Sequence, residues 1–447
     1  MVLEALLSKG DRNMVEWLPK EDRITTAMKT TKALHSLLVT ASLSLATTSF
    51  SYAAQLKVWA WDPNFNVAAM QEAGNRYKAN HADFDLTVID SGKEDIEQKL
   101  HTMLASGVKS SLPDVALIED YNAQKYLQAY PGAFEPLDKS IDYSQFAPYK
   151  VQVMTVNGRV YGIPFDSGVA GMFYREDYLT QAGFSDKDMQ NISWDRFIEI
   201  GKQVKEKTGK YMLTLDINDV VLPHIMMQSG GQWFFNQDGS LNIANNAALK
   251  ATLETMKKIN DANIARPTSG WSSFVGAFNA GQVATVTSGV WIMGSIKSVD
   301  DQSGKWRVAP IPSLDIKGAR HASNQGGSSW YVLSSSKNKA QAIDFLNQTF
   351  AHDSDMYQKL LVERGALATY LPAAKGQAYN VADPFFGGEH VFEKFATWVS
   401  QIPQVNYGMY TQEVDQTIAA EIPAIFGGEP VDSVLKRVEE TLKYQIM

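Results

Sequence analysis

The sequence predicts an α/β fold with a parallel sheet, divided into two or three lobes, and one observation supports each part of this prediction. Strand-like and helix-like segments alternate along residues 55–120, which is the pattern of strand-helix-strand units. The chain has 447 residues, of which 45% are hydrophobic, and this length favours two or three lobes over one small core. Because the sequence has no low-complexity linker and no repeat, we expect strand-like crossings to join the lobes.

The first strand is QLKVWAW at residues 55–61, which Asp62-Pro63 ends. A helical segment follows in VAAMQEAGNRYKAN, where apolar residues recur near every third or fourth position. FDLTVID at 84–90 predicts the second strand, and the amphipathic stretch 94–107 predicts a helix that stops at its glycine. PDVALIED at 113–120 predicts the third strand.

Ligands bind parallel sheets beyond the carboxyl ends of the strands. The segments WAWDPNF (59–65) and IEDYN (118–122) both follow strand ends, so we expect two loops on the same rim. Farther along, Asn157-Gly158 predicts a hairpin turn, and residues 193–209 predict a helix with Ser193 as its N-cap. Four more helices are predicted at 246–263, 272–281, 338–351 and 411–425.

The segment that begins at Met28 has the features of a secretory signal peptide. A positive start at residues 29–32 precedes an apolar stretch at 37–46, and Ser51-Tyr52-Ala53 fits the small-x-small cleavage rule. We therefore expect residues 28–53 to be removed; a buried N-terminal helix is the alternative.

Residues 1–27 are charged and precede this complete signal, so we expect them to be an over-extended start and translation to begin at Met28. No later segment reaches the roughly 18 apolar residues of a membrane span, which predicts a soluble mature protein. Cysteine is absent, which excludes disulfides, thiolate zinc sites and a lipid-anchored cysteine. These features together favour the periplasm.

Charge and motifs exclude several classes of function. The net charge is −8 and no dense Lys/Arg stripe is present, so nucleic acid is not an expected partner. The 7 histidines have no metal-ligand spacing, and nucleophile, phosphate-loop and dinucleotide motifs are missing, so we expect no metal and no cofactor. The acidic pairs Glu119/Asp120 and Asp216/Asp219 leave a glycosidase open, although neighbouring carboxylates are more often hydrogen-bonding or solvated groups.

Six segments carry a resemblance to one family. They are PDVALIEDY, NGRVYGIPFDSGVAGMFYREDYLTQAGF, SWDRFIEIGKQV, AFNAGQVATVTSGVW, GGSSWYVLSSSKNKAQAIDFLNQT and GGEPVDSVLKRVEETL. In this order they resemble the extracellular solute-binding proteins of carbohydrate ABC importers, the maltose-binding-protein-like group. The resemblance covers essentially all of residues 54–447, and departs from the family pattern at Arg175 and in the missing lipidated cysteine.

The resemblance implies a two-lobed periplasmic-binding-protein fold of type II, with a mostly parallel sheet flanked by helices in each lobe. Lobe one would comprise residues 54–165 and 328–366, and lobe two residues 166–327 and 367–447. Three chain crossings, near 164–168, 326–330 and 366–372, would form the hinge. The resemblance implies that the protein is a monomeric periplasmic subunit of an ABC importer, without enzymatic activity. It would bind a mono- or oligosaccharide and deliver it to the permease, which works with a cytoplasmic ATPase.

A sugar has C–H faces that suit aromatic rings and hydroxyls that suit carboxylates and amides. Trp59 is expected in the core. Trp61 has the same strand parity but lies at the strand exit, where ligand contact is favoured. The candidate ligand-binding residues are Trp61, Asp62, Glu119, Asp120, Tyr121, Asp166, Asn218, Asp219, Trp233, Trp271, Trp291, Gly327 and Tyr410.

Two other functions stay open. A secreted glycosidase or lyase shares aromatic residues and carboxylates, but needs an acid and base at fixed separation or a basic cluster. A binding protein for a polyamine or an oligopeptide also shares them, although the order of the motifs argues against it. A uronic-acid ligand would need a cation in the cleft, for which Arg175, Arg364 and Lys93 are the candidates.

Overall fold

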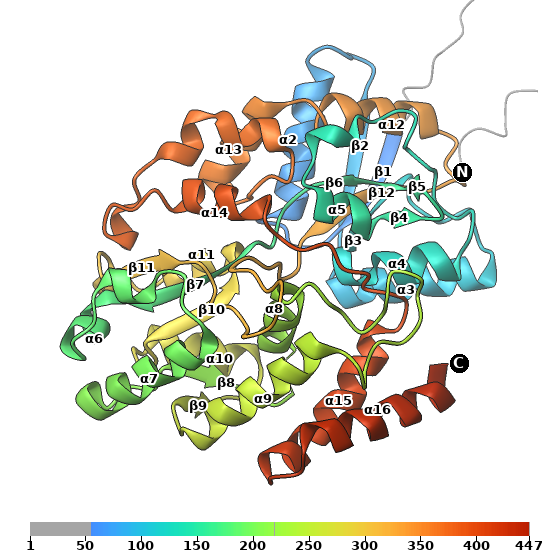
Figure 1. Ribbon diagram of the computed structural model, residues 1–447. Helices are drawn as coiled ribbons and strands as arrows, with labels where there is room; N and C mark the ends of the chain where they lie inside the picture. Colours follow the sequence, from blue (N-terminus) through green and yellow to red (C-terminus); the bar gives the residue numbers. More distant parts are fainter. Residues whose placement is uncertain (1–54, 219, 447) are drawn as a thin grey trace, which may run out of the picture. The chain divides into compact units, whose positions relative to one another are not determined.

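The computed structural model describes residues 55–218 and 220–446 (Figure 1). The predicted signal peptide, the over-extended start and the candidate Asp219 lie outside the described residues. No helix in the described part of the chain combines the length and the apolar character that crossing a membrane requires.

The first sheet has five strands in the order β2-β1-β3-β12-β6. Its strands β1 (Gln55–Ala60), β2 (Asp85–Asp90) and β3 (Val115–Glu119) are the three predicted ones, and β1 pairs in parallel with both of the others. β12 (Ser328–Val332) runs antiparallel to β3 and to β6 (Gly162–Pro164). The predicted strand-helix-strand start is confirmed, and two strands from far along the chain extend it.

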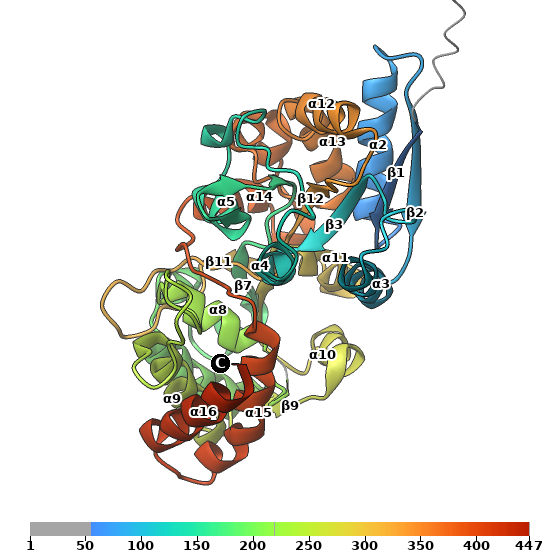
Figure 2. The same ribbon diagram turned by 90° about the vertical axis from the view of Figure 1, so that its right-hand side faces the viewer.

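Alternate side chains of β3 pack into two helical layers, as a strand buried on both faces requires. Val115 and Leu117 join the apolar cluster that includes residues of α2 (Asn66–Lys78), α12 (Lys339–Gln348) and α13 (Ser354–Arg364). Ala116 and Ile118 join the cluster that includes residues of α3 (Lys93–Ser106) and α4 (Asp120–Ala129). In Figure 2, β12 and β3 lie between α12 above and α4 below.

The second sheet has the order β10-β7-β11 and is antiparallel, whereas a mostly parallel sheet was expected. Its central strand β7 (Ala170–Arg175) lies between β10 (Thr285–Gly289) and β11 (Trp306–Ala309). β7 begins where the chain enters from the first sheet, and β10 ends at the same place, with Gly289 opposite Ala170. The two strands must therefore run in opposite directions. β8 (Leu213–Leu215) and β9 (Ala265–Pro267) form a separate parallel pair.

The helices around the second sheet begin and end close to their predicted bounds. Ser193 caps α7, because its Oγ accepts a hydrogen bond from the Arg196 amide at 3.1 Å, and Gly209 ends the helix at φ 71°. The helices of this half are α6 (Glu176–Gln181), α7 (Trp194–Thr208), α8 (Val221–Ser229), α9 (Ala247–Asp261), α10 (Gly270–Asn279), α11 (Met293–Ile296), α14 (Val391–Val399), α15 (Thr411–Phe426) and α16 (Val431–Ile446). α15 and α16 pack against each other and against α9.

The hairpin of β4 (Thr155–Val156) and β5 (Arg159–Val160) follows α5 (Pro148–Val153). Asn157 and Gly158 both have positive φ, 50° and 72°, which is the backbone of a tight hairpin turn. The predicted turn is confirmed.

Three chain segments cross between the two sheets and are hydrogen-bonded to one another. The Ser167 amide donates to the Leu367 carbonyl at 2.8 Å, and the Gln325 amide donates to the Gly168 carbonyl at 2.7 Å. A Cβ on Gly168 would lie 1.9 Å from the Gln325 carbonyl oxygen, so the close approach of these segments requires glycine. The crossings lie where the resemblance implied, while the lobe boundaries themselves stay a prediction.

Candidate binding site

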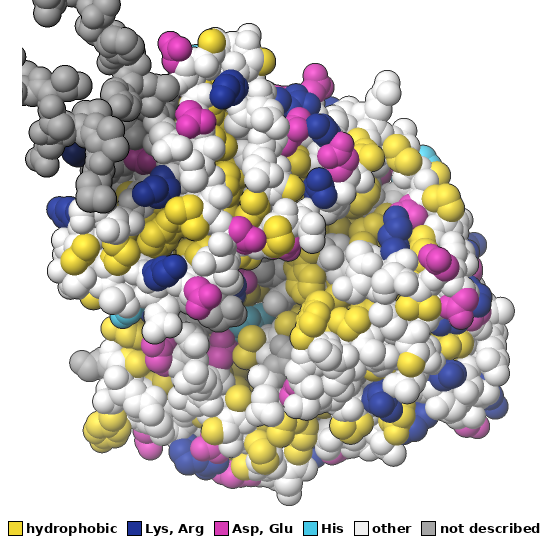
Figure 3. Space-filling model, turned by 180° about the vertical axis from the view of Figure 1, so that it is seen from behind, with side chains coloured by type: hydrophobic (Ala, Val, Ile, Leu, Met, Phe, Trp, Pro, Cys, Tyr) yellow, Lys and Arg dark blue, Asp and Glu magenta, His cyan; other side chains and the backbone are white. Residues whose placement is uncertain are grey.

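A recess with a volume of about 390 Å³ opens beside α10 in the second half of the chain. Its lining residues come from the loop before α8, the start of α10 and the end of β10: Asp216, Asn218, Val221, Ser269, Gly270, Trp271, Phe274, Ser288 and Trp291. α10 and α3 lie on the same side of the molecule in Figure 2. Figure 3 shows the molecule from that side, where the surface is hollowed near its centre and hydrophobic and acidic side chains lie around the hollow.

Two tryptophans form one wall of the recess. Trp271 lies in the first turn of α10 and is 53% exposed, and Trp291 lies just after β10 and is half-buried. Their ring centroids are 5.8 Å apart at an interplanar angle of 41°, and the Trp291 indole N–H donates to the Gln325 carbonyl at 2.8 Å. Two ring faces that open onto one recess suit the C–H faces of a sugar.

Polar groups line the rest of this recess. The Asp216 carboxylate accepts from the amides of Asn218 at 3.0 Å and Gly270 at 2.9 Å, which fixes the loop and the start of α10 against each other. Ser288 is fully buried, and its hydroxyl has no hydrogen-bond partner among the described residues. A buried hydroxyl without a partner costs free energy, and the Ser288 hydroxyl is covered in this form, so a ligand can bond to it only where the wall of the recess moves aside.

A residue at the end of a strand of the first sheet lies close to the Trp291 side of the recess. Glu119 ends β3, and its Oε2 accepts a hydrogen bond from the Lys93 ammonium at the start of α3. A Cβ placed on Gly326 would lie 3.9 Å from Glu119 Oε1 and 3.7 Å from Trp291 Nε1. The carboxylate of Glu119 and the edge of the Trp291 indole therefore flank the same point of the second crossing. The structure brings these two predicted residues together.

Trp61 and Asp62 lie at the end of β1, as predicted, but neither lines the recess. Trp61 is half-buried and packs against the apolar cluster of the first sheet. Asp62 has a φ of 61° and its Oδ1 accepts from the amides of Asn64 and Phe65, which forms the turn into α2. Ligand contact by these two residues stays a prediction. Trp59 is buried, as predicted.

Asp120 lies inside the protein. The expected loop at 118–122 is absent, because α4 begins at Asp120 directly after β3. Asp120 Oδ2 accepts from the Lys150 ammonium at 2.7 Å, and both side chains are 0% exposed. Burial raises the pKa of Asp120 to about 7, although Lys150 acts in the opposite direction.

Asp166 and Gly327 also belong to this buried region of the crossings. Asp166 is buried, its Oδ1 accepts from the amide and hydroxyl of Ser328 at 2.8 Å each, and its carbonyl accepts from Lys150. Gly327 has a φ of 92°, and a Cβ there would lie 3.0 Å from Asp120 Oδ2. Asp120, Asp166 and Gly327 thus hold the crossings together in this structure, and their contact with a ligand stays a prediction.

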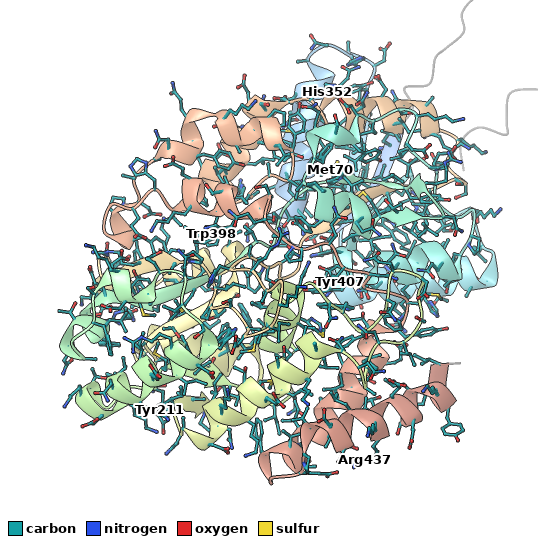
Figure 4. The ribbon with its side chains drawn as sticks, in the orientation of Figure 1. Met70, Tyr211, His352, Trp398, Tyr407 and Arg437 are labelled. Atoms are coloured by element: carbon teal, nitrogen blue, oxygen red, sulfur yellow. The ribbon has the colours of Figure 1, made fainter. Side chains whose placement is uncertain are left out.

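Tyr121 and Trp233 form an aromatic cluster with Tyr407, and Tyr410 follows Tyr407 by three positions. The Tyr121 ring lies parallel to that of Trp233 at 5.8 Å and edge-on to that of Tyr407 at 4.7 Å. Trp233 is buried and its indole N–H donates to the Thr411 hydroxyl, while Tyr410 is half-buried at the start of α15. Figure 4 places Tyr407 between the upper and lower halves. Burial raises the pKa of Tyr407 well above its usual value, so its hydroxyl stays a donor.

Sequence reasoning missed two residues that matter here. Ser288 lies in the fully buried strand β10, three positions before Trp291, and Thr285 and Thr287 of the same strand are also polar, so no pattern singles Ser288 out. Lys150 follows Pro148 in a short helix, and no sequence pattern predicts that its ammonium is fully buried beside Asp120.

The cations considered for a uronic acid differ in their environments. Arg175 is buried and pairs with Asp177, and Arg364 is exposed at the end of α13. Lys93 is the one of the three that contacts a candidate site residue, through Glu119. Among residues 55–218 and 220–446, no group of three or more His, Asp or Glu side chains could hold a metal ion.

The family model described as "Bacterial extracellular solute-binding protein" matches residues 72–386. A lactose-binding protein from Rhizobium radiobacter is 55% identical over 415 residues, which is 93% of this chain and 98% of the relative. An arabinooligosaccharide-binding protein from Halalkalibacterium halodurans is 27% identical, over 72% of this chain and 73% of the relative.

Solved structures show the same fold at low identity. The galacto-N-biose-/lacto-N-biose I-binding protein from Bifidobacterium longum matches with a TM-score of 0.71 at 20% identity, over 89% of this chain and 98% of the other. A sugar-binding protein from Xanthomonas citri matches with a TM-score of 0.71 at 19% identity, over 87% and 96%. The chain belongs to the bacterial extracellular solute-binding proteins, and its two-lobed fold is theirs. The predicted family and fold are confirmed.

Proposed function

We propose that this protein binds lactose or a closely related galactoside between its two lobes and delivers it to the permease of an ABC importer. The recess at Trp271 and Trp291 carries the proposal, because it combines two aromatic faces with a carboxylate, an amide and a buried hydroxyl that lacks a partner. The similarity to a lactose-binding protein over nearly the full length of that relative supports the choice of sugar.

The sugar is captured because its contacts are divided between the two halves of the chain. Asp216, Ser288 and Trp271 belong to the expected lobe two, and Glu119 ends a strand of the first sheet. A sugar that contacts both sets of residues is bound better when the lobes are close together, so it shifts the equilibrium toward the closed form. The closed form is then the one that the permease accepts.

The setting of this function is the periplasm, which the protein reaches through a cleaved signal peptide and where it works as a monomer. The sugar leaves the protein chemically unchanged, since delivery requires only opening of the lobes. Mass measurement of the mature chain tests the cleavage after Ala53, and chromatographic recovery of the sugar tests whether it stays intact.

The direct test is a calorimetric titration of the purified protein with lactose, its separate monosaccharides, arabinooligosaccharides and a polyamine. We expect saturable binding of the galactoside. Trp271→Ala should weaken binding by about 10–100-fold, because one stacking face and its buried area are lost.

Tyr444→Ala is the control variant, since Tyr444 is 92% exposed and does not line the recess. Its affinity should equal that of the unmodified protein. Binding of a polyamine in place of every sugar, or equal affinity of the Trp271→Ala variant and the control, would contradict the proposal. Recovery of cleaved sugar would show an enzyme instead.

A further inference from the structure

The Glu119 carboxylate has two oxygen atoms in different surroundings. Oε2 accepts from the Lys93 ammonium, while Oε1 has no hydrogen bond from any of the described residues. The two side chains are 22% and 32% exposed, respectively, so each keeps contact with solvent. Glu119 ends β3 and Lys93 follows β2, which places both at the carboxyl edge of the first sheet.

The second oxygen lies toward the aromatic recess. Glu119 Oε1 and Trp291 Nε1 lie 3.9 Å and 3.7 Å from the same point, the Cβ position of Gly326. Gly326 has a φ of 74° and carries no side chain that could separate them. A sugar stacked on Trp291 therefore has a carboxylate oxygen within its reach on the side of the first sheet.

At this margin the Lys93 ammonium pairs with Glu119 Oε2, and the oxygen that lies near Gly326 is Oε1. The recess itself adds the carboxylate of Asp216, whereas Arg175 is buried in its pair with Asp177. A ligand carboxylate placed at the same point would meet Glu119 Oε1, while the Lys93 ammonium is already bonded to the other oxygen of that carboxylate. Hydroxyl groups, in contrast, can donate to Glu119 Oε1 and keep the ion pair intact.

We infer that the Glu119–Lys93 pair is a charge filter, which selects neutral sugars and rejects their acid derivatives. The inference rests on the proposed function and adds the charge of the ligand to it. Glu119 accepts a sugar hydroxyl through Oε1, and Lys93 orients the carboxylate through Oε2. Without the negative charge of Glu119, the repulsion between this position and a ligand carboxylate is lost.

The experiment compares lactose with two of its acid derivatives by calorimetric titration of the purified protein. Lactobionate carries a carboxylate at the glucose end, and lactose oxidised at galactose C6 carries one at the other end. The unmodified protein should bind lactose at least about 100-fold more tightly than either acid, since like charges in a partly desolvated site repel strongly.

Glu119→Gln should reduce lactose affinity by about tenfold or more, because a hydrogen bond to a charged group is lost. The preference for lactose over at least one acid should also fall by tenfold or more. Lys93→Met should weaken lactose binding without lowering this preference. Glu135→Gln, which changes the half-exposed pair with Lys339, is the matched control and should leave affinity and preference unchanged.

A preference that stays the same in Glu119→Gln overturns the charge filter and leaves lactose binding established. Tighter binding of an acid than of lactose by the unmodified protein also overturns it. If no neutral sugar binds at all, the proposed function fails first, and the inference falls with it. The salt dependence gives an independent readout, because high salt should narrow the preference in the unmodified protein but not in Glu119→Gln.

Discussion

Glu119 and Asp120 are neighbours in the chain, and each pairs with a lysine, yet they serve two different regions of the molecule. Glu119 is partly exposed at the margin of the recess and pairs with Lys93. Asp120 is fully buried at the chain crossings and pairs with Lys150. At the crossings Asp120, Lys150 and Asp166 satisfy one another, and at the recess Ser288 and Glu119 keep unused hydrogen-bonding capacity. Unused capacity at the wall of a recess, more than the type of residue, marks a ligand site.

The largest expected effect comes from breaking the buried pair. Lys150→Met removes the cation beside the fully buried Asp120, so at pH 8, above the pKa of this carboxyl, the native state must either keep an unpaired charge or take up a proton. The free energy of unfolding at pH 8 should fall by about 3–5 kcal/mol. Urea denaturation measures this change. Lys258→Met is the matched control, because the Lys258–Asp195 pair has the same 2.7 Å separation with both side chains more than half exposed.

The control should hardly change the stability, since exposed pairs contribute little. Equal effects of the two substitutions would contradict the distinction between the buried crossings and the exposed surface. A second variant, Asp120→Leu with Lys150→Met, should recover most of the loss, because it removes both charges together.

The pH dependence of stability should sharpen the same comparison. Burial raises the pKa of Asp120 from 3.8 to about 7, so the native state keeps this proton where the unfolded chain loses it. The contribution of the protonated Asp120 carboxyl to the free energy of unfolding is fully present below about pH 4 and is lost as the pH rises toward 7. The free energy of unfolding should fall there by at most about 1.4 kcal/mol per pH unit.

Urea denaturation at intervals between pH 4 and pH 8 tests this slope. Asp120→Asn should remove the contribution of this group, whereas Glu119→Gln should keep it, because only the first variant changes the buried carboxylate. An equal or steeper fall in Asp120→Asn than in the unmodified protein would show that other groups dominate the titration.

Much of the fold was predictable because its signals are local. Alternating apolar segments predicted β1, β2 and β3, and Asn157-Gly158 predicted the hairpin, since each depends on a few neighbouring residues. The antiparallel direction of β7 was not predictable in this way, because it depends on where the chain enters the second sheet from the first. Order along the chain does not state the direction of a strand after a crossing.

The site was predictable only in its residue types. Trp271, Trp291 and Asn218 line the recess, and their contact with a ligand stays a prediction. The same choice of residue types also selected Asp120 and Trp233, which are buried and paired. Sequence cannot separate these cases, since the difference between Glu119 and Asp120 depends on partners 26 and 30 positions away.

The smallest expected effect on affinity concerns two buried serines, of which only one lines the recess. The hydroxyls of Ser288 and Ser323 both lack partners among the described residues, but only Ser288 lines the recess. Removing either hydroxyl should leave the free energy of unfolding unchanged or raise it by up to about 1 kcal/mol, because no hydrogen bond is lost in the free protein.

Binding should separate the two variants. Ser288→Ala should weaken lactose binding by about 5–10-fold, which is the contribution of one neutral hydrogen bond, and Ser323→Ala should not weaken it. Calorimetric titration of both variants, with urea denaturation of each, measures the two quantities together. Equal affinities would mean that the Ser288 hydroxyl does not contact the sugar. A loss of stability in Ser288→Ala would mean that the hydroxyl is already satisfied in the free protein, and the contrast between the crossings and the recess would then rest on Glu119 alone.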